Sequence, residues 1–121
     1  MKWTDGRVRG FITSTIRSGF RRWPEKYTAL DRAKVGKIKN KQTGRLAEHY
    51  RCASCNGNFI SKDVQVDHID PVVPLTGFTT WDNFIERMFC DSEKLQVLCI
   101  KCHKDKTKKE SELRKNLRGK K

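Results

Sequence analysis

The sequence predicts an α+β fold in which a four-cysteine zinc site holds a small core together behind a basic helical extension. Two Cys-x-x-Cys pairs stand at 52–55 and 99–102. Segments around 64–68 and 95–99 have the apolar pattern of short strands, and apolar residues recur at helical spacing near the N-terminus. With 36% apolar residues, against about 45–50% in typical domains, the chain has material for only a modest core.

Positive charge is concentrated at both ends of the chain. The formal net charge is +13, and residues 1–48 carry 13 Lys/Arg against 4 Asp/Glu. Residues 104–121 carry 9 against 3, whereas the middle carries 5 against 7. Basic arms around a slightly acidic centre favour a nucleic-acid enzyme, with phosphate contacts outside and metal-binding carboxylates inside. The same charge is compatible with a ribosomal-type protein or an ordinary solvated surface.

The hydropathy pattern argues against a membrane protein. No segment approaches the ~20 apolar residues of a membrane span, and the N-terminus lacks the apolar region of a signal peptide. We therefore expect a soluble cytoplasmic protein with no membrane partner. In a reducing compartment, five cysteines indicate metal ligands or reactive thiols sooner than disulfides.

Two helices are predicted before residue 36. The first spans about 17 residues, is capped by Thr4 and Asp5, and ends near Trp23-Pro24. Its apolar stripe consists of Val8, Phe11, Ile12, Ile16, Phe20 and Trp23. The second opens at Pro24, turns Tyr27, Leu30 and Ala33 inward, and stops at Gly36.

Gly36 to Arg45 is polar, basic and without periodicity, so we expect a loop that lies along a phosphate backbone, or else a disordered connector. Candidate DNA contacts in the basic extension and this linker are Arg7, Arg17, Arg21, Arg22, Lys37, Lys39, Lys41 and Arg45.

The paired cysteine motifs predict a structural zinc ion. Cys52 and Cys55 precede Asn-Gly, which favours a tight turn, and Cys99 and Cys102 form the second pair. Four thiolates satisfy tetrahedral Zn²⁺. Residues 56–98 between the pairs exceed the gap of ordinary zinc ribbons, so further structure is expected there. A redox dithiol is the alternative, and the remaining Cys90 is expected to pack as a small apolar residue.

Further elements are expected between and after the cysteine pairs. Residues 64–68 form a strand, 71–77 a Pro- and Gly-containing loop, and 95–99 a second strand. Thr80 caps a helix with an apolar face, and a last helix runs from about Cys102 to Leu117 before a frayed tail at 119–121. The apolar residues of the middle helix are Trp81, Phe84, Ile85, Met88 and Phe89.

Asp67, His68 and His103 form the candidate reaction centre. His103 directly follows the last cysteine, and a hairpin followed by a helix would bring it opposite Asp67. These two side chains suit a partly hydrated Mg²⁺, Mn²⁺ or another divalent ion. His68 would remain free as a general base, and Lys106 and Lys108 would steady the phosphate.

At these residues the chain resembles the HNH endonucleases, which have a ββα-metal (His-Me finger) core. The resemblance rests on Cys52-x-x-Cys55, on Val66-Asp67-His68-Ile69-x-Pro71 and on Leu95-Gln96-x-Leu98-Cys99-x-x-Cys102-His103-x-x-Lys106-Thr107, which together span about residues 50–107. The 72–74 loop and the 81–90 helix are similar to those of small stand-alone phage HNH proteins, including homing-type members. The resemblance implies His68 as general base, Asp67 and His103 as metal ligands, and a structural zinc held by the four cysteines.

One position departs from the family pattern. The family asparagine before Leu-Gln is replaced by Lys94. That asparagine orders the loop between strand and helix or helps to hold the metal, whereas a protonated lysine cannot ligate and would instead offer its charge to a phosphate. Asn83 is a poor substitute because it falls on a predicted helix.

The resemblance divides the chain into a basic helical extension and linker (1–48), a nuclease domain with the zinc site (49–110) and a basic tail (111–121). It implies a metal-dependent endonuclease that nicks or cuts double-stranded DNA, as a monomer or a homodimer, in the host cytoplasm if the chain is phage-encoded. A non-catalytic zinc module that binds nucleic acid is the first alternative. A ribosome-associated RNA-binding protein is the second.

Overall fold

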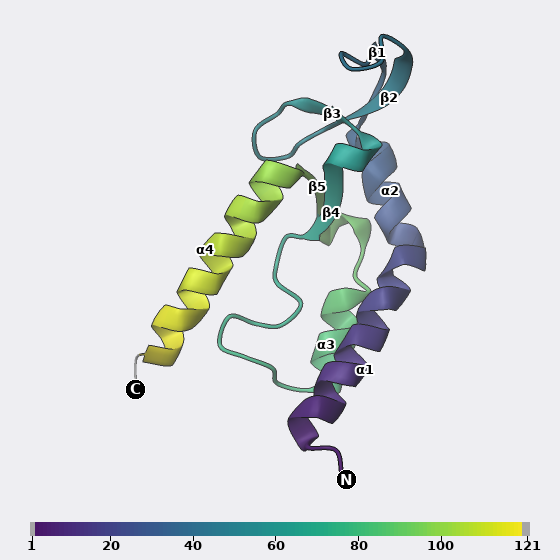
Figure 1. The fold of residues 1–121 in the computed structure, drawn as a ribbon. Helices are drawn as coiled ribbons and strands as arrows, with labels where there is room; N and C mark the ends of the chain where they lie inside the picture. Colours follow the sequence, from purple (N-terminus) through teal and green to yellow (C-terminus); the bar gives the residue numbers. More distant parts are fainter. Residues whose placement is uncertain (1, 120–121) are drawn as a thin grey trace.

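The computed structural model describes residues 2–119 and has a mixed α+β fold, the coarse class that the sequence predicts (Figure 1). Its elements are α1 (Asp5–Gly19), η1 (Phe20–Arg22), α2 (Pro24–Ala33), β1 (Lys34–Lys39), β2 (Leu46–Arg51), β3 (Asn58–Ile60), η2 (Ser61–Asp63), β4 (Val64–His68), α3 (Trp81–Met88), η3 (Ser92–Lys94), β5 (Leu95–Cys99) and α4 (Ile100–Gly119). Among the described residues, no helix combines the length and apolar character needed to span a membrane. Lys120 and Lys121 of the expected frayed tail lie outside the described residues.

Two small antiparallel sheets form the centre of the molecule. One has the order β1-β2-β3, and the other pairs β4 with β5. The predicted strands at 64–68 and 95–99 are confirmed, with Val66 opposite Val97 and Asp67 opposite Gln96. Val97, Leu98 and Cys99 are buried, so β5 is the more enclosed strand of its sheet.

The prediction of an irregular linker from Gly36 to Arg45 is wrong, because this segment belongs to the β1–β2 hairpin. The turn closes through two backbone hydrogen bonds, from Asn40 to Arg45 O (2.8 Å) and from Gly44 to Asn40 O (2.7 Å). Gly36 has a φ of +114°, which side-chain-bearing residues rarely adopt. The hairpin depends on backbone pairing with little buried apolar surface, and such a strand has no hydrophobic period for the sequence to reveal.

α1 matches its prediction in position but only partly in packing. Thr4 caps it by accepting a hydrogen bond from Arg7 N at 3.2 Å. Ile16 and Phe20 pack against the buried cluster of Val72, Phe84 and Met88. The N-terminal part of the apolar stripe is exposed instead, with Val8 at 41% and Phe11 at 67%.

α2 begins at Pro24 as predicted but buries a different face. Ala29 is its buried residue, whereas Tyr27, expected to point inward, is 52% exposed. The helix ends at Ala33 and leads directly into β1, so Gly36 is not its stop. The helix docks through polar contacts around Ser92, whose N–H donates to Glu25 (3.0 Å) and whose hydroxyl accepts from Arg32 (2.6 Å).

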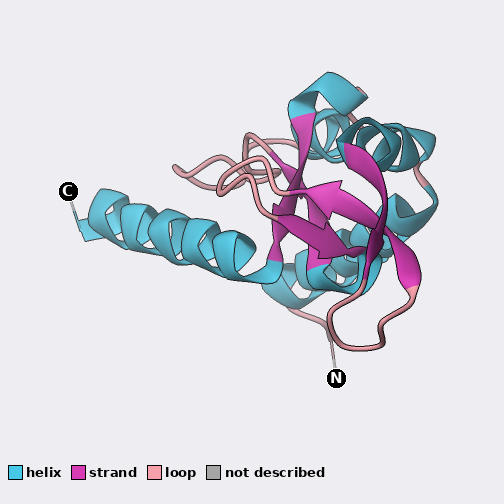
Figure 2. Cartoon of the chain, turned by 90° about the horizontal axis from the view of Figure 1, so that it is seen from above, coloured by secondary structure: helices cyan, strands magenta, loops and turns pink. Residues whose placement is uncertain are grey.

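α4 packs against the β4–β5 sheet, and α3 lies in the connection between these two strands. Thr80 caps α3 as predicted, and the side chains of Phe84 and Met88 in this helix are buried. α4 starts at Ile100, two residues before the predicted start, and extends away from the body of the molecule (Figure 2). Arg114 secures its outer half by donating to the carbonyls of Val73 (2.7 Å) and Pro74 (2.9 Å). The proposed division at residues 48 and 110 stays a prediction.

We expect Phe84→Ala to lower the free energy of unfolding by about 3–5 kcal/mol, because it leaves a cavity in the buried cluster. Phe11→Ala removes the same group from an exposed position (67%) and is expected to change stability by less than about 0.5 kcal/mol. Urea denaturation followed by circular dichroism measures both values. Equal losses in the two variants would contradict the assignment of the core.

Candidate functional site

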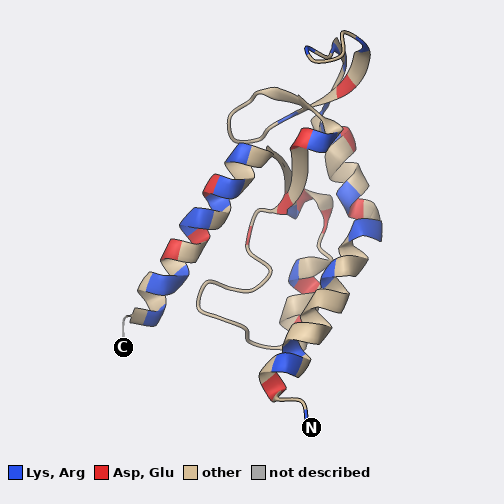
Figure 3. Ribbon diagram, viewed as in Figure 1, with Lys and Arg blue, Asp and Glu red and all other residues tan. Residues whose placement is uncertain are grey.

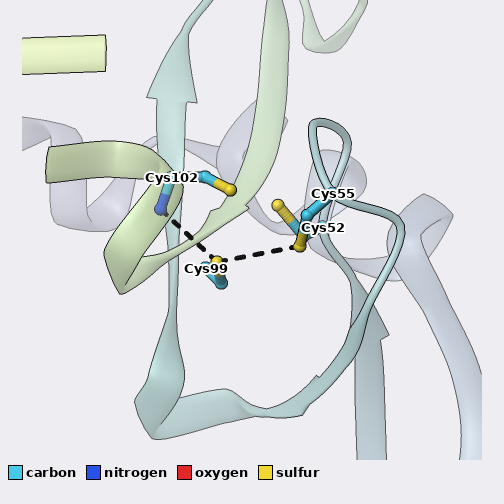
Figure 4. A group of neighbouring side chains, drawn as sticks. All are labelled: Cys52, Cys55, Cys99 and Cys102. Carbon is cyan, nitrogen blue, oxygen red and sulfur yellow. Dashed lines mark hydrogen bonds between the residues drawn. The ribbon is translucent and has the colours of Figure 1, made fainter. Parts of the chain in front are cut away.

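The four cysteines of the two Cys-x-x-Cys pairs meet in space. Their sulfur atoms all lie within 4.8 Å of one another, and Cys55 Sγ is 4.0 Å from Cys99 Sγ. Figure 4 shows the four side chains gathered between the two chain segments. A tetrahedral zinc ion with Zn–S bonds of about 2.3 Å places its sulfurs about 3.8 Å apart. The donor set therefore fits a zinc ion, and the coarser prediction of a four-cysteine metal site is confirmed.

Local backbone geometry directs the sulfur atoms of Cys52 and Cys55 to the same side. Cys52 N donates to Gly57 O (2.9 Å) and Asn56 N donates to Cys52 O (2.9 Å), which closes a tight turn around Cys55. Asn56 adopts a positive φ of 62°, and a Cβ added to Gly57 would come within 2.9 Å of the Phe59 ring. The Asn-Gly pair thus allows the turn that brings both sulfurs to one side.

The positions of Cys99 and Cys102 are set by a strand that leads directly into a helix. Cys99 ends β5 and Cys102 lies in the first turn of α4, where its N–H points at Cys99 Sγ (3.5 Å). Ala53 N also donates to Val97 O (2.8 Å), so the first turn is bonded to β5. The cysteine cluster consequently connects the two sheets.

Hydrogen bonding gives Cys52 and Cys102 very different pKa values. Burial opposes ionisation of Cys52, but hydrogen bonds from the backbone at Cys55, Cys99 and Ser54 lower its pKa to about 6. The side-chain hydrogen bond to Cys99, followed by burial, raises the pKa of Cys102 to about 12. Zinc binds thiolates, so a divalent ion is what would compensate the charge of all four sulfurs at neutral pH.

Asp67 is the centre of a second polar cluster, on the side of β4 that faces α4. Its Oδ1 lies 3.7 Å from His103 Nε2, and its Oδ2 lies 2.9 Å from Lys106 Nζ and accepts from Gln96 Nε2 at 3.0 Å. The Asp67 side chain is 11% exposed and that of His103 is 32% exposed. The structure therefore brings Asp67 and His103 together, as the sequence predicts.

His68 points to the other face of β4, because successive strand residues alternate. Its Nε2 lies 2.9 Å from the carbonyl of Met88, and its ring packs on Phe20 at a centroid distance of 4.6 Å. A carbonyl only accepts, so Nε2 carries the proton and Nδ1 keeps its lone pair. Burial lowers the pKa of His68, as do the nearby charges of Arg17 and Lys106, against opposing effects of Met88 O and Asp67. The ring is neutral at pH 7.

Lys94 lies apart from Asp67 and His103. With Asn83 it lines a depression of about 240 Å³ whose other residues are Asp70, Glu86, Arg87 and Cys90. Its backbone carbonyl accepts from Ile69 N (3.0 Å), which holds the chain just after His68. Backbone pairing at position 94 thus orders this loop whatever side chain stands there. Cys90 is buried, as the sequence predicts.

Lys106 and Lys108 occupy different environments on α4. Lys106 is bonded to Asp67 and to the carbonyl of His68 (2.9 Å), so its ammonium group is part of the cluster. Lys108 is exposed and shares a shallow surface depression with His103.

The predicted DNA contacts are exposed residues of α1, η1 and the β1–β2 hairpin, segments whose Lys and Arg positions are coloured in Figure 3. The guanidinium of Arg17 lies 5.7 Å from the centre of the Phe84 ring, and its charge acts on His68. Lys39 and Lys41 line a depression of about 450 Å³ beside the buried His49. The remaining exposed candidates are Arg7, Arg21, Arg22, Lys37 and Arg45.

Gln96 and Glu110 join the cluster without having been predicted. Gln96 stands directly opposite Asp67 in the strand pair, and Glu110 lies 3.5 Å from Lys106. The strand register would have indicated Gln96, and the i,i+4 spacing would have indicated Glu110.

No protein-family model, curated protein or solved structure matches this chain. Function is therefore inferred from the residues and their geometry.

We expect the purified protein to contain about one zinc ion per chain and to lose cooperative folding when the ion is chelated, because the cysteines connect the two sheets. Cys102→Ser should abolish zinc retention, measured by mass spectrometry of the metal together with a thermal melt. Cys90→Ala, a change at the cysteine outside the cluster, should retain zinc. Zinc retention in Cys102→Ser, or a metal-free protein that folds equally well, would contradict a structural metal site.

Proposed function

We propose that this protein is a metal-dependent DNA endonuclease of the HNH type, which hydrolyses phosphodiester bonds of double-stranded DNA to 5′-phosphate and 3′-hydroxyl ends. The observation that carries the proposal is the approach of His103 to Asp67 (3.7 Å) beside an oriented, neutral His68 on the same strand. A carboxylate–imidazole pair for a metal and a second imidazole for a proton are what such hydrolysis requires.

The arrangement of elements supports a ββα-metal core. β4 carries Asp67 and His68, β5 pairs with it in antiparallel register, and α4 carries His103 one turn after the strand ends. The cysteine cluster sits at the junction of β5 and α4 and thereby sets the direction of the helix. Two strands and a helix thus present the residues in the order in which the family resemblance uses them.

The donor set at Asp67 fits a hard divalent ion. Oδ1 and His103 Nε2 supply one oxygen and one nitrogen, and water and a DNA phosphate would complete the octahedral coordination of Mg²⁺ or Mn²⁺. Asp67 Oδ2 is held by Gln96 and Lys106, which leaves Oδ1 for the ion. A bound ion would supply positive charge beside the scissile phosphate and the leaving 3′ oxygen.

His68 acts as the general base through Nδ1. Water attacks phosphorus and passes a proton to Nδ1, the bond from phosphorus to the 3′ oxygen breaks, and the leaving 3′ oxygen takes a proton from solvent water to give the 3′-hydroxyl. The Met88 carbonyl holds Nε2–H at 2.9 Å, which orients the ring and stabilises the imidazolium that forms. Arg17 and Lys106 disfavour that imidazolium and so promote release of the proton.

Charge distribution supports DNA as the substrate. The chain carries a net charge of +13, and Lys and Arg residues occur along α1, α4 and the β1–β2 turn, as the blue ribbon segments of Figure 3 show. These basic surfaces do not include Asp67, the acidic residue of the site. DNA phosphates can therefore bind around the reaction centre without crowding it. Lys108, in the same depression as His103, is a candidate phosphate contact.

A non-catalytic zinc module that binds nucleic acid is the second candidate. It is favoured by Lys94 in place of the family asparagine and by the ion pair of Asp67 with Lys106 at 2.9 Å. Such a module would bind DNA through its basic surfaces and would lack a second divalent-ion site that depends on Asp67.

Zinc-loaded protein should nick or linearise supercoiled plasmid in the presence of Mg²⁺ or Mn²⁺. His68→Ala should slow cleavage by about 10²–10⁴-fold, because it removes the general base, and Asp67→Asn should be comparably impaired. His49→Gln changes the remaining histidine, which lies in β2. This variant should cleave normally once a thermal melt shows that it folds. An intact plasmid with wild type, or full activity in His68→Ala, would eliminate the nuclease.

The rate should depend on pH through His68. Burial lowers the pKa of its imidazole below the usual 6.5, so the base stays unprotonated at neutral pH and activity should fall only as the solution is acidified below that value. Arg17→Gln removes a charge that lowers this pKa, and the acidic limb of the cleavage profile should therefore move to higher pH. If the acidic limb lies at the same pH in Arg17→Gln and wild type, the titrating group is not His68.

A further inference from the structure

We propose that Lys106 is an internal counter-cation which keeps the Asp67–His103 pair from binding a divalent ion tightly until a DNA phosphate arrives. The inference rests on the nuclease proposed above and concerns how that site is regulated. Metal and DNA would then bind cooperatively, and the DNA-free protein would hold the metal weakly.

Lys106 is held at the site from three sides. Its Nζ lies 2.9 Å from Asp67 Oδ2, donates to the carbonyl of His68 at 2.9 Å, and lies 3.5 Å from Glu110 Oε1. An ammonium group has three N–H donors, so these three acceptors satisfy it completely. The side chain is 23% exposed, which limits screening by water. A lysine placed in this way is bonded within the site itself, whereas the sequence predicts that Lys106 contacts the phosphate.

The charge of this arrangement disfavours a free divalent ion. Lys106 neutralises the carboxylate charge of Asp67, and the other ligand, His103, is a neutral imidazole when it binds a metal. A cation at Oδ1 would therefore meet a fixed positive charge on the opposite oxygen of the same carboxylate. With two protein ligands and little net negative charge, the pair is a weak site for Mg²⁺ or Mn²⁺.

A DNA phosphate changes that balance. It brings a negative charge and an oxygen ligand to the side of Asp67 that Lys106 does not occupy, which offsets the repulsion of the ammonium group. Glu110 Oε1 lies 3.5 Å from Lys106 Nζ and can retain the ammonium group while Oδ1 takes the ion. By linkage, DNA should raise the affinity for metal as much as metal raises the affinity for DNA at this site.

The direct test is a Mn²⁺ titration of DNA-free, zinc-loaded protein, followed by electron paramagnetic resonance of the free ion. Lys106→Met keeps the aliphatic chain but removes the charge, and it should bind Mn²⁺ about tenfold or more tightly than wild type. Lys106→Arg retains the charge and should remain weak. Lys104→Met removes an exposed lysine from the same helix and should match wild type.

The second arm adds a duplex oligonucleotide in a His68→Ala background, which keeps the DNA intact. DNA should raise the Mn²⁺ affinity of the His68→Ala protein strongly. The gain in affinity should be smaller in the double variant that also carries Lys106→Met. Asp67→Asn with DNA measures the ions that the duplex binds by itself. Retained zinc and a normal melt establish that each variant is folded.

The outcomes separate this inference from the proposed function. Equal Mn²⁺ affinities in wild type and Lys106→Met, with plasmid cleavage intact, would overturn the role of Lys106 and leave the nuclease standing. Tighter Mn²⁺ binding in Lys106→Met that Asp67→Asn abolishes, in a protein that does not cut, would support the counter-cation and overturn the nuclease. Absence of any Asp67-dependent Mn²⁺ binding would overturn both.

Discussion

The four-cysteine cluster is the constraint on which the rest of the molecule depends. Its first pair follows β2, and its second pair spans the end of β5 and the first turn of α4, so a single ion bound by the four sulfurs would connect both sheets and the last helix. A chain with 36% apolar residues buries few large side chains, and a metal can supply what the small core lacks. Because an ion bound by Cys99 and Cys102 would restrain the start of α4 against the end of β5, it would stabilise the contacts of His103 and Lys106 with Asp67 on β4.

The strand β4 then divides the chemistry between its two faces. Asp67 faces α4 and lies among charged and amide groups, whereas His68 faces α1 and α3 and lies among Phe20 and the Met88 carbonyl. The alternation of a strand suffices to give two adjacent residues these different surroundings. Burial on the apolar side lowers the pKa of His68 and so favours its neutral imidazole. The N-terminal helices therefore contribute to the site by burying His68, in addition to presenting basic side chains.

Two lysines bear on the strength of any activity, and they do so in opposite ways. Lys94 stands where the proposed HNH pattern would have an asparagine, and the backbone at this position bonds to Ile69. Lys106 contacts Asp67 directly and alters the electrostatics there. Of the two lysines, Lys106 therefore has the greater electrostatic consequence for the proposed site.

The sequence by itself determined the four-cysteine cluster, both strands of the β4–β5 pair, the capped helices α1 and α3, and the meeting of Asp67 with His103. These follow from ligand spacing, capping residues and local periodicity, which operate over a few residues. Only the tertiary structure decided the β1–β2 hairpin, the exposure of Tyr27, the anchoring of Lys106 and the opposite directions of Asp67 and His68. Backbone pairing without a buried face leaves no local pattern, and the partner of a long charged side chain depends on which element lies across from it.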